Sequence, residues 1–485
     1  MVYLGLQVFR CGFEVRIPPL ATCVETIAFF LGALSSGCRT SSSPFLLEIT
    51  WADGRAPIEG EQRGRLELDL IQEGTDRIHL VIEAPSPGFE GDIPIPSLFL
   101  PTRVFARMKA GNASAMGALP PFIPGTLPKA RLLLVEEGRC MSVSSSGLTF
   151  QHFGGAMLIA EAQGVVAGGV GEEGNPSDLI ERFIPQLLGT SRSQAISLRT
   201  PSPLSTATLF RFAKTPKLLL KDSARIFLVD LQSDQISPIL LPFDLGSNSS
   251  IGGFGDHAVI VNDLPSTSGS GTMIWINQKG EYRSIEVPAP RPRTAIGALA
   301  QGGGFVLAGG NPPGHELFLH ISIGPTGHLS ISAFGDRIQR QGGALFPSPS
   351  RRTFFFVGSF VEDGEPDSTT WIVRGCPERC SAEIGPPWPH PRRHPAFVST
   401  PTHGWVIGGE EKNEASDRVE RIEWNDEDPQ FVESRLANPR IFPLAAHFEG
   451  GLVLLCCGKD TSGLRKDFEL CAPSALAMET NLVQK

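Results

Sequence analysis

Two segments far apart in the chain share one pattern. Residues 164–183, GVVAGGVGEEGNPSDLIERF, and residues 404–422, GWVIGGEEKNEASDRVERI, each begin with a short apolar run that leads into a Gly-Gly pair. An acidic loop containing Asn and Ser follows in both, and each segment closes on a Glu-Arg pair flanked by apolar residues. Internal similarity of this kind indicates a structural unit that is repeated along the chain. Repetition is therefore the feature that most constrains the fold.

The unit recurs at a nearly regular interval. Comparable apolar strands, spaced 41 to 53 residues apart, are centred on Val166, Leu219, Ile260, Leu307, Phe356, Ile407 and Leu455. Hairpins follow several of them, as in TMIWINQKGEYRSIEV at 272–287. Many short strands bounded by Gly, Pro, Asn and Asp predict an all-β protein. Four strands per repeat of this length form one blade, so residues 131–485 are predicted to form a β-propeller of about seven four-stranded blades.

The glycine positions resemble those of the kelch repeat, in which a Gly-Gly pair closes the second strand of a blade and a Glu-Arg or similar pair lies on the third. The matching residues are Gly168 and Gly169 with Glu181 and Arg182, Gly408 and Gly409 with Glu420 and Arg421, and, for the glycines alone, Gly309 and Gly310. The repeats around Leu219 and Ile260 lack the pair. The resemblance covers residues 131–480 and implies a kelch-like propeller. Its glycines are structural, because strands that converge on an axis need close backbone approach and positive φ.

A propeller ring is usually closed by a blade that takes strands from both ends of the repeat region. The segment 130–138, ARLLLVEEG, precedes the first complete repeat and is predicted to complete the last blade. That pairing would bring Cys140 near Cys456, Cys457 or Cys471, where a disulfide would hold the ring closed.

The cysteines after residue 38 are candidates for disulfides, and their connectivity cannot be deduced from the sequence. They are Cys140, Cys376, Cys380, Cys456, Cys457 and Cys471. A zinc interpretation of CPERC at 376–380 is weak, because zinc needs four ligands and no second Cys or His pair lies at matching spacing.

A second strand-rich unit precedes the repeats. Residues 44–112 contain stretches such as GRLELDLI, in which apolar and charged residues alternate, as in strands with one buried face. This density of strands predicts a small β-sandwich of immunoglobulin-like type, although the Cys–Trp–Cys signature of true immunoglobulin domains is missing. The Gly-, Ala- and Pro-rich segment 113–130 is predicted to be a linker.

The first 37 residues have the pattern of a secretory signal. Arg10 and Arg16 precede the apolar run TIAFFLGAL at 26–34, which leads through small residues to Cys38. This run is shorter than the roughly 20 apolar residues that a membrane-spanning helix needs. LSSGC resembles the lipobox of bacterial lipoproteins, which implies acylation of Cys38 and a tether over residues 38–43. Translation would start at Met1 or at Val15.

The lipobox resemblance implies a bacterial cell-envelope protein. Since Arg39, rather than Asp, follows the cysteine, it implies an outer-membrane lipoprotein anchored in the membrane through Cys38. The alternative is a secreted protein without a lipid. A net charge of −9 argues against nucleic acid as a partner, because phosphate binding needs a basic surface. The most basic stretch, PHPRRHP at 389–395, is predicted to be a solvated loop.

No catalytic motif stands out in the chain. Gly-x-Ser-x-Gly in a strand–helix context, His-Glu-x-x-His and phosphate-cradling loops are missing. Galactose oxidase, a kelch-like enzyme, needs a Tyr-Cys radical centre and further Tyr and His copper ligands, and this chain has two tyrosines. Sialidase-like propellers carry Asp-box repeats, which are not visible in this sequence. The sequence therefore predicts a protein that is not an enzyme and has no cofactor, unless the acidic loops described next bind Ca²⁺.

Three loops that follow glycine-terminated strands are acidic, and in a propeller such loops emerge on one face. Their carboxylates are Glu172, Glu173, Asp178, Glu362, Asp363, Glu365, Asp367, Glu410, Glu411, Glu414 and Asp417. Such a face could bind Ca²⁺ through oxygen ligands or attract a cationic partner. The plainer interpretation is that these loops keep a secreted domain soluble.

Together these features predict a non-catalytic binding or scaffold lipoprotein that uses loops on one propeller face to bind a protein or a glycan. The alternative is a carbohydrate-active enzyme with a divergent site in the axial pocket, and a third is a purely structural envelope protein. Carboxylates or His clustered at the axis would favour the enzyme. An apolar or glycine-lined channel would favour binding. Propellers of this kind serve unrelated functions, so the fold alone does not decide.

Overall fold

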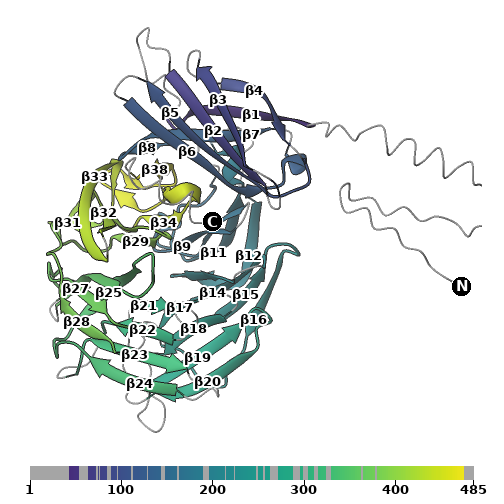
Figure 1. Cartoon of the computed structure of the whole chain (residues 1–485). Coiled ribbons are helices and arrows are strands. Elements are labelled where there is room, and N and C mark those ends of the chain that lie inside the picture. The colour runs from purple at the N-terminus through teal and green to yellow at the C-terminus, as the bar shows by residue number, and fades with distance from the viewer. Residues whose placement is uncertain are drawn as a thin grey trace, which may run out of the picture.

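The computed structural model describes an N-terminal sheet and a seven-bladed propeller (Figure 1). The described residues are 43–473, apart from 54–63, 73–74, 76, 85–88, 96, 111–112, 128, 144–147, 161–162, 189–195, 213–214, 223, 247–248, 255–256, 263–270, 288–294, 299–303, 311–314, 324–328, 362–363, 377–378 and 426. The signal, the acylation site Cys38 and the tether lie outside these residues, as do both candidate translation starts. Within this part of the chain, no helix has the length and apolarity to cross a membrane.

The N-terminal unit is a single seven-stranded mixed sheet in the order β3-β2-β5-β6-β7-β1-β4. Its strands are β1 (Ser43–Trp51), β2 (Gly64–Gln72), β3 (Ile78–Ala84), β4 (Phe89–Ile95), β5 (Thr102–Ala110), β6 (Ala113–Phe122) and β7 (Ala130–Glu136). Neighbours are antiparallel except β1 and β7, which are parallel. β6 and β7 share only two residue pairs, so the sheet curls sharply there. Leu47 of β1 and Leu68 of β2 consequently share one buried core.

Two details of this unit differ from the prediction made from the sequence. One curled sheet, a half-barrel, takes the place of an immunoglobulin-like sandwich of two sheets. The segment predicted to be a linker, 113–130, holds strand β6 and the short 3-10 helix η1 (Pro124–Thr126). Gly117 gives the physical reason, because a Cβ atom there would lie 2.5 Å from the carbonyl oxygen of Leu133. Small residues in this segment thus permit close strand contact and do not mark a flexible linker.

The propeller has seven blades, as the repeat pattern predicts, and each is built on antiparallel strands. Blades 1 to 3 are β9 (Ala156–Ala160), β10 (Gln163–Ala167), β11 (Ser177–Phe183) and β12 (Ile196–Leu204); β13 (Thr208–Arg211), β14 (Lys217–Lys221), β15 (Ile226–Asp230) and β16 (Gln235–Ile239); β17 (Ser250–Phe254), β18 (His257–Asn262), β19 (Gly271–Asn277) and β20 (Tyr282–Val287). Blades 4 and 5 are β21 (Ala295–Ala298), β22 (Gly304–Ala308), β23 (Phe318–Ile323) and β24 (Leu329–Phe334); β25 (Gln341–Pro347), β26 (Phe354–Phe360), β27 (Trp371–Arg374) and β28 (Ser381–Ile384).

Blades 6 and 7 depart from the simple four-strand order. Blade 6 contains β29 (Ala396–Ser399), β30 (Gly404–Ile407), β31 (Glu410–Glu411), β32 (Glu414–Asn425) and β33 (Asp428–Arg440). Blade 7 contains β34 (Leu444–His447), β35 (Val453–Cys456), β38 (Phe468–Cys471) and β8 (Cys140–Ser142), with a small hairpin of β36 (Lys459–Asp460) and β37 (Gly463–Leu464). Two further 3-10 helices are η2 (Pro185–Leu187) and η4 (Glu449–Gly451).

Strand β8 closes the ring. It pairs antiparallel with β38 as the outermost strand of blade 7, so this blade does combine both ends of the repeat region. The predicted closing segment, 130–138, is instead β7 of the N-terminal sheet, and the chain reaches blade 7 only after the turn at Gly138. Ala130, Leu132 and Leu134 of this strand lie in the core of the curled sheet, which explains why the strand is taken up there.

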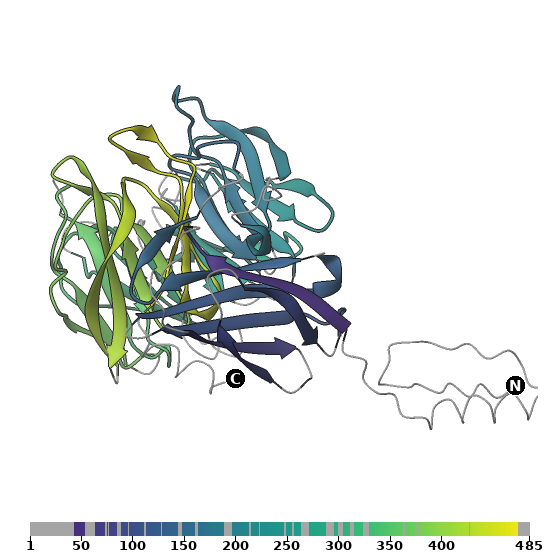
Figure 2. The same ribbon diagram turned by 90° about the horizontal axis from the view of Figure 1, so that it is seen from above.

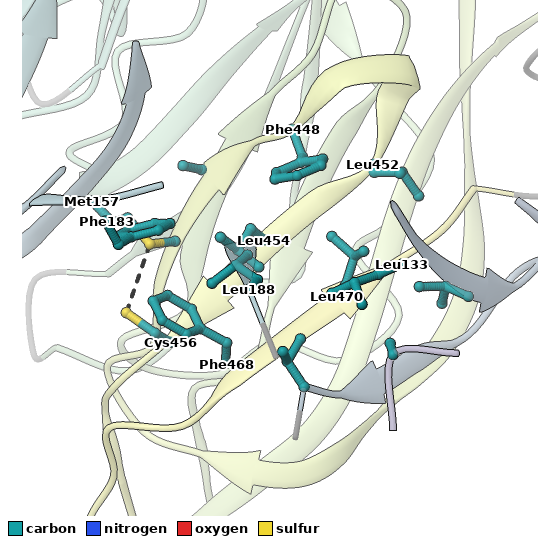
Figure 3. Close-up of a cluster of buried hydrophobic side chains, with 14 of the residues drawn as sticks. Leu133, Met157, Phe183, Leu188, Phe448, Leu452, Leu454, Cys456, Phe468 and Leu470 are labelled. Atoms are coloured by element: carbon teal, nitrogen blue, oxygen red, sulfur yellow. Dashed lines mark hydrogen bonds between the residues drawn. The ribbon is translucent and has the colours of Figure 1, made fainter. Parts of the chain in front are cut away.

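The N-terminal sheet packs directly on the propeller (Figure 2). Leu133 of β7 belongs to the same buried cluster as Leu454 of blade 7 and Phe183 of blade 1 (Figure 3). Because these side chains come from both units, the sheet and the closing blade share one apolar core. Ring closure and the docking of the N-terminal sheet are therefore coupled.

Candidate binding site

Three blades contain a fully buried carboxylate at the same place on the third strand. Glu181, Glu420 and Glu469 are all inaccessible to solvent. Each pairs with a basic side chain from the segment before the first strand of its own blade. The contacts are His152 Nε2 to Glu181 Oε2 at 2.8 Å, Arg392 Nη1 to Glu420 Oε1 at 2.7 Å, and Arg440 Nη2 to Glu469 Oε1 at 2.9 Å.

The same basic side chains hold the turn after the second strand. His152 Nδ1 lies 2.7 Å from the carbonyl oxygen of Gly168, and Arg440 Nη1 donates to that of Cys457 at 2.9 Å. Arg392 Nε donates to the carbonyl oxygen of Gly408. Each basic group thus links the turn to the buried carboxylate, which makes the Glu of the kelch-like Glu-Arg pair a structural residue.

The environment of Glu181 shows how such a charge is kept inside the protein. Burial alone would raise the pKa of this carboxyl group. Hydrogen bonds from His152, from the side chain and backbone N–H of Thr149 and from the backbone N–H of Phe150 outweigh burial and hold the pKa below its usual value. A carboxylate with this many donors stays ionised in the core.

Five of the nine described carboxylates of the acidic loops are paired with arginine. The ion pairs are Asp178 with Arg199 at 2.7 Å, Glu365 with Arg393 at 2.6 Å, Asp367 with Arg340 at 2.8 Å, Glu411 with Arg418 at 3.3 Å and Asp417 with Arg435 at 2.7 Å. Glu172, Glu173 and Glu414 are exposed, Glu410 is partly buried, and Glu362 and Asp363 lie outside the described residues. These loops therefore present mixed charge.

No Ca²⁺ ligand set is assembled from the carboxylates that the structure places. Among the described residues, no group of three or more Asp, Glu, His or Cys side chains is arranged to hold a metal ion. A calcium site needs six to eight oxygen ligands around one point. The three loops belong to blades 1, 5 and 6, and the described carboxylates of different loops do not converge on such a point.

The axis of the propeller is lined by the first strand of each blade. These strands contact one another around the ring, and β34 meets β9 (Figure 1). Their sequences are AMLIA, TLFR, SIGGF, AIGA, QGGALFP, AFVS and LAAH. Within these seven strands Asp and Glu do not occur, and Arg211 and His447 are the ionisable side chains. Small and apolar residues thus predominate at the axis.

A polar pocket of about 450 Å³ lies at the outer side of blade 6, where β32 and β33 approach the start of β8. Its polar lining includes Arg139, His390, Arg418, Glu433, Ser434 and Arg435. Ser434 Oγ donates to the carbonyl oxygen of Gly138 at 2.5 Å, which ties β33 to the segment that leads from the N-terminal sheet into β8. The pocket is therefore built where the two structural units and the ring closure meet.

Ion pairs hold the charged groups of this pocket. His390 Nε2 lies 2.9 Å from Arg418 Nη1 and 3.1 Å from Glu433 Oε1, so it can accept from the one or donate to the other. Arg418 and Arg435 also pair with Glu411 and Asp417, two carboxylates of the predicted acidic face. The pocket consequently offers donors and acceptors side by side.

The basic stretch 389–395 is predicted from the sequence to be a solvated loop. It is a loop, with Pro389 and His394 exposed, but it is not solvated throughout. Arg392 is fully buried against Glu420, and His390 lines the pocket. The sequence does contain a pattern that indicates the role of Arg392 in holding the turn after the second strand. Arg392 precedes Gly408 by 16 residues, and His152 precedes Gly168 by the same number.

Solved structures that resemble this chain include two proteins of low sequence identity. A fungal alcohol oxidase of the AA5 family in complex with copper is 14% identical with a TM-score of 0.49, covering 69% of this chain and 76% of its own. YjhT is 9% identical with a TM-score of 0.42, covering 67% of this chain and 96% of its own. No protein-family model and no curated protein matches the chain. Likenesses at this level carry no argument about activity.

Proposed function

We propose that this protein is a non-catalytic binding protein and that the pocket beside blade 6 binds a hydroxyl-rich glycan. The observation that supports this most directly is the pairing of donors and acceptors around the pocket, with His390 within hydrogen-bond distance of both Arg418 and Glu433. A sugar hydroxyl both donates and accepts, so it can bind beside such groups through the hydrogen-bonding capacity that Arg418 and Glu433 retain. A volume of about 450 Å³ falls within the usual range for small-ligand sites.

The absence of a carboxylate pair from the described axial strands supports a binding role over the carbohydrate-active enzyme. Glycoside hydrolysis by the common mechanisms uses two Asp or Glu residues that flank the scissile bond. The described axial strands contain neither residue type. In the pocket, Glu420 is buried and held by Arg392, which leaves Glu433 as the more accessible lining carboxylate.

The proposed location is the bacterial cell envelope, with a lipid on Cys38 anchoring the protein in the outer membrane, or the medium if the protein is secreted without lipid. Two disulfides, Cys140–Cys471 and Cys376–Cys380, support an oxidising compartment. The partner is then a glycan or a glycan-bearing protein at the cell surface. Net charge again argues against nucleic acid.

A glycan-array screen of the full chain, followed by calorimetric titration of the best ligand, tests this proposal. Arg418→Gln and Glu433→Gln should each weaken binding about tenfold, because each removes a charged hydrogen-bonding group. Arg337→Gln is the matched control, since Arg337 forms an exposed ion pair with Glu316 in blade 4, away from the pocket. A ligand bound equally well by all three variants would place the site elsewhere, and a screen without any ligand would overturn the glycan assignment.

A further inference from the structure

Cys457 stands where three other blades carry glycine. It follows β35 as Gly168 follows β10, Gly309 follows β22 and Gly408 follows β30. The φ angles agree, at 62° for Cys457, 65° for Gly168, 67° for Gly309 and 59° for Gly408. Cys457 is thus an L-residue in the left-handed region, which residues other than glycine rarely adopt.

This backbone conformation brings the sulfur atoms of Cys456 and Cys457 together. In a regular strand, side chains of consecutive residues point to opposite faces. The positive φ of Cys457 breaks that alternation, and its Sγ lies 2.8 Å from the Sγ of Cys456. Both side chains are fully buried, and Cys456 Sγ also contacts Met157 Sδ at 3.7 Å (Figure 3).

We infer that Cys456 and Cys457 form a vicinal disulfide, a third cross-link located in the closing blade. The other four described cysteines are already paired in two disulfides, which supports the oxidising setting proposed above. The two residues have free thiols in this structure. Closure requires a disulfide donor, such as a protein oxidant of the thiol–disulfide exchange class. One thiolate attacks the donor disulfide and forms a mixed disulfide, releasing one donor thiol. The second thiolate then attacks the protein sulfur of that mixed disulfide and releases the other donor thiol, so the two protons and two electrons that the pair loses are taken up by the donor.

The position of Cys456 and Cys457 gives this cross-link a structural role. The carbonyl of Cys457 accepts a hydrogen bond from Arg440, which also pairs with the buried Glu469. The disulfide between residues 456 and 457 would fix the turn that holds the Cys457 carbonyl in place for this hydrogen bond. Burial raises the pKa of the Cys457 thiol well above its usual value, and a buried thiol of this kind exchanges slowly. The disulfide between Cys456 and Cys457 therefore forms before blade 7 packs.

Peptide mapping of the full chain, isolated without reductant and alkylated in denaturant, tests the inference. Trypsin releases residues 441–459, a peptide that contains Cys456 and Cys457 and no other cysteine. We expect this peptide to be unalkylated and lighter than the dithiol form by two hydrogen atoms, and to take two alkyl groups after reduction. Two alkyl groups without reduction, a link to another peptide, or a metal ion bound to the two sulfurs would each overturn the inference.

Cys457→Gly is the matched control, because other blades carry glycine in this conformation and the variant should fold. Its 441–459 peptide should take one alkyl group at Cys456 without reduction, which shows that the reagent reaches this residue in denaturant. The Cys140–Cys471 link should remain in the same sample. If Cys456 of this variant stayed unalkylated, protection in the wild type would not come from a bond to Cys457, and the inference would fail.

Discussion

Cys140 lies directly opposite Cys471 in the pairing of β8 with β38, and a disulfide joins these residues across 331 positions of the chain. The bond connects the strand that enters from the N-terminal sheet to the last strand of the propeller. Cys471 is one of the three partners that the sequence leaves open for Cys140. Its location makes the closure of the ring covalent.

Replacing both cysteines, Cys140→Ser with Cys471→Ser, should destabilise the protein by about 5 kcal/mol, because the bond closes a very long loop in the unfolded chain. Denaturant unfolding without reductant measures the change. Cys376→Ser with Cys380→Ser is the control, since this pair spans only 4 positions and should cost less than half as much. Equal losses for the two pairs would show that loop closure does not set the effect.

The buried pair of Arg392 and Glu420 gives a second prediction. Arg392→Leu should destabilise blade 6 by about 3–5 kcal/mol, because it leaves the Glu420 carboxylate buried without its cation. Adding Glu420→Leu should recover part of this loss by removing the unpaired charge. Denaturant unfolding of the single and double variants gives the two free energies. A double variant less stable than Arg392→Leu would indicate that the carboxylate has other essential partners.

Gly117 tests the close contact between β6 and β7. Gly117→Val should destabilise the N-terminal sheet by about 3 kcal/mol, because the new side chain meets Leu132 and the backbone of Leu133 in a packed interior. Gly174→Ala is the control, because Gly174 has a positive φ but open space around its Cβ, and it should cost about 1 kcal/mol. Thermal unfolding of both variants shows which substitution destabilises the protein more. If Gly174→Ala were the more damaging, backbone conformation rather than contact would dominate.

Residues that follow the repeat can be predicted from the sequence, and residues that depend on contacts between units cannot. The Gly-Gly pairs at 168–169 and 408–409 mark two blades, and the regular spacing of the apolar strands leads to seven. The same turn in blade 7 could not be predicted, because Cys457 takes the place of the first glycine and its φ of 62° is known only from the structure. The prediction that residues 130–138 complete the last blade is wrong, because the apolar pattern of a strand does not determine which sheet will bury it. The prediction for Arg392 is wrong because its partner, Glu420, is 28 positions away.

The acidic loops lead to a prediction about calcium. Millimolar Ca²⁺ or excess EDTA should leave the unfolding temperature of the full chain unchanged, because Asp178, Glu365, Asp367, Glu411 and Asp417 are paired with arginines. A ligand that binds only the folded state must raise stability by mass action, so thermal unfolding detects binding at any of these loops. A Ca²⁺-dependent rise that disappears on neutralising Glu410, Glu411, Glu414 and Asp417 would restore the calcium site.

The buried ring of His403 leads to a prediction about how the stability of the protein depends on pH. Burial, helped by the nearby charge of Arg421, lowers the pKa of His403 to about 4 from an ordinary value of 6.5. The unfolded chain therefore takes up a proton at this ring near pH 6.5, whereas the folded chain does so only near pH 4. The stability contributed by the neutral ring is complete above pH 6.5 and is lost as the pH falls toward 4. A shift of this size corresponds to about 3 kcal/mol.

Urea unfolding at a series of pH values between 7.5 and 4.5 measures this loss. Burial also lowers the pKa of His320 and His394, so these rings add to the slope in the same direction. The lowered pKa of Glu181 acts only below its unfolded value of about 4.5, which keeps it out of this window. His403→Gln replaces the ring by a group that does not titrate, so its stability should fall less steeply over the series than that of the wild type. Parallel slopes for the two proteins would mean that His403 is protonated in the folded state as readily as in the unfolded chain.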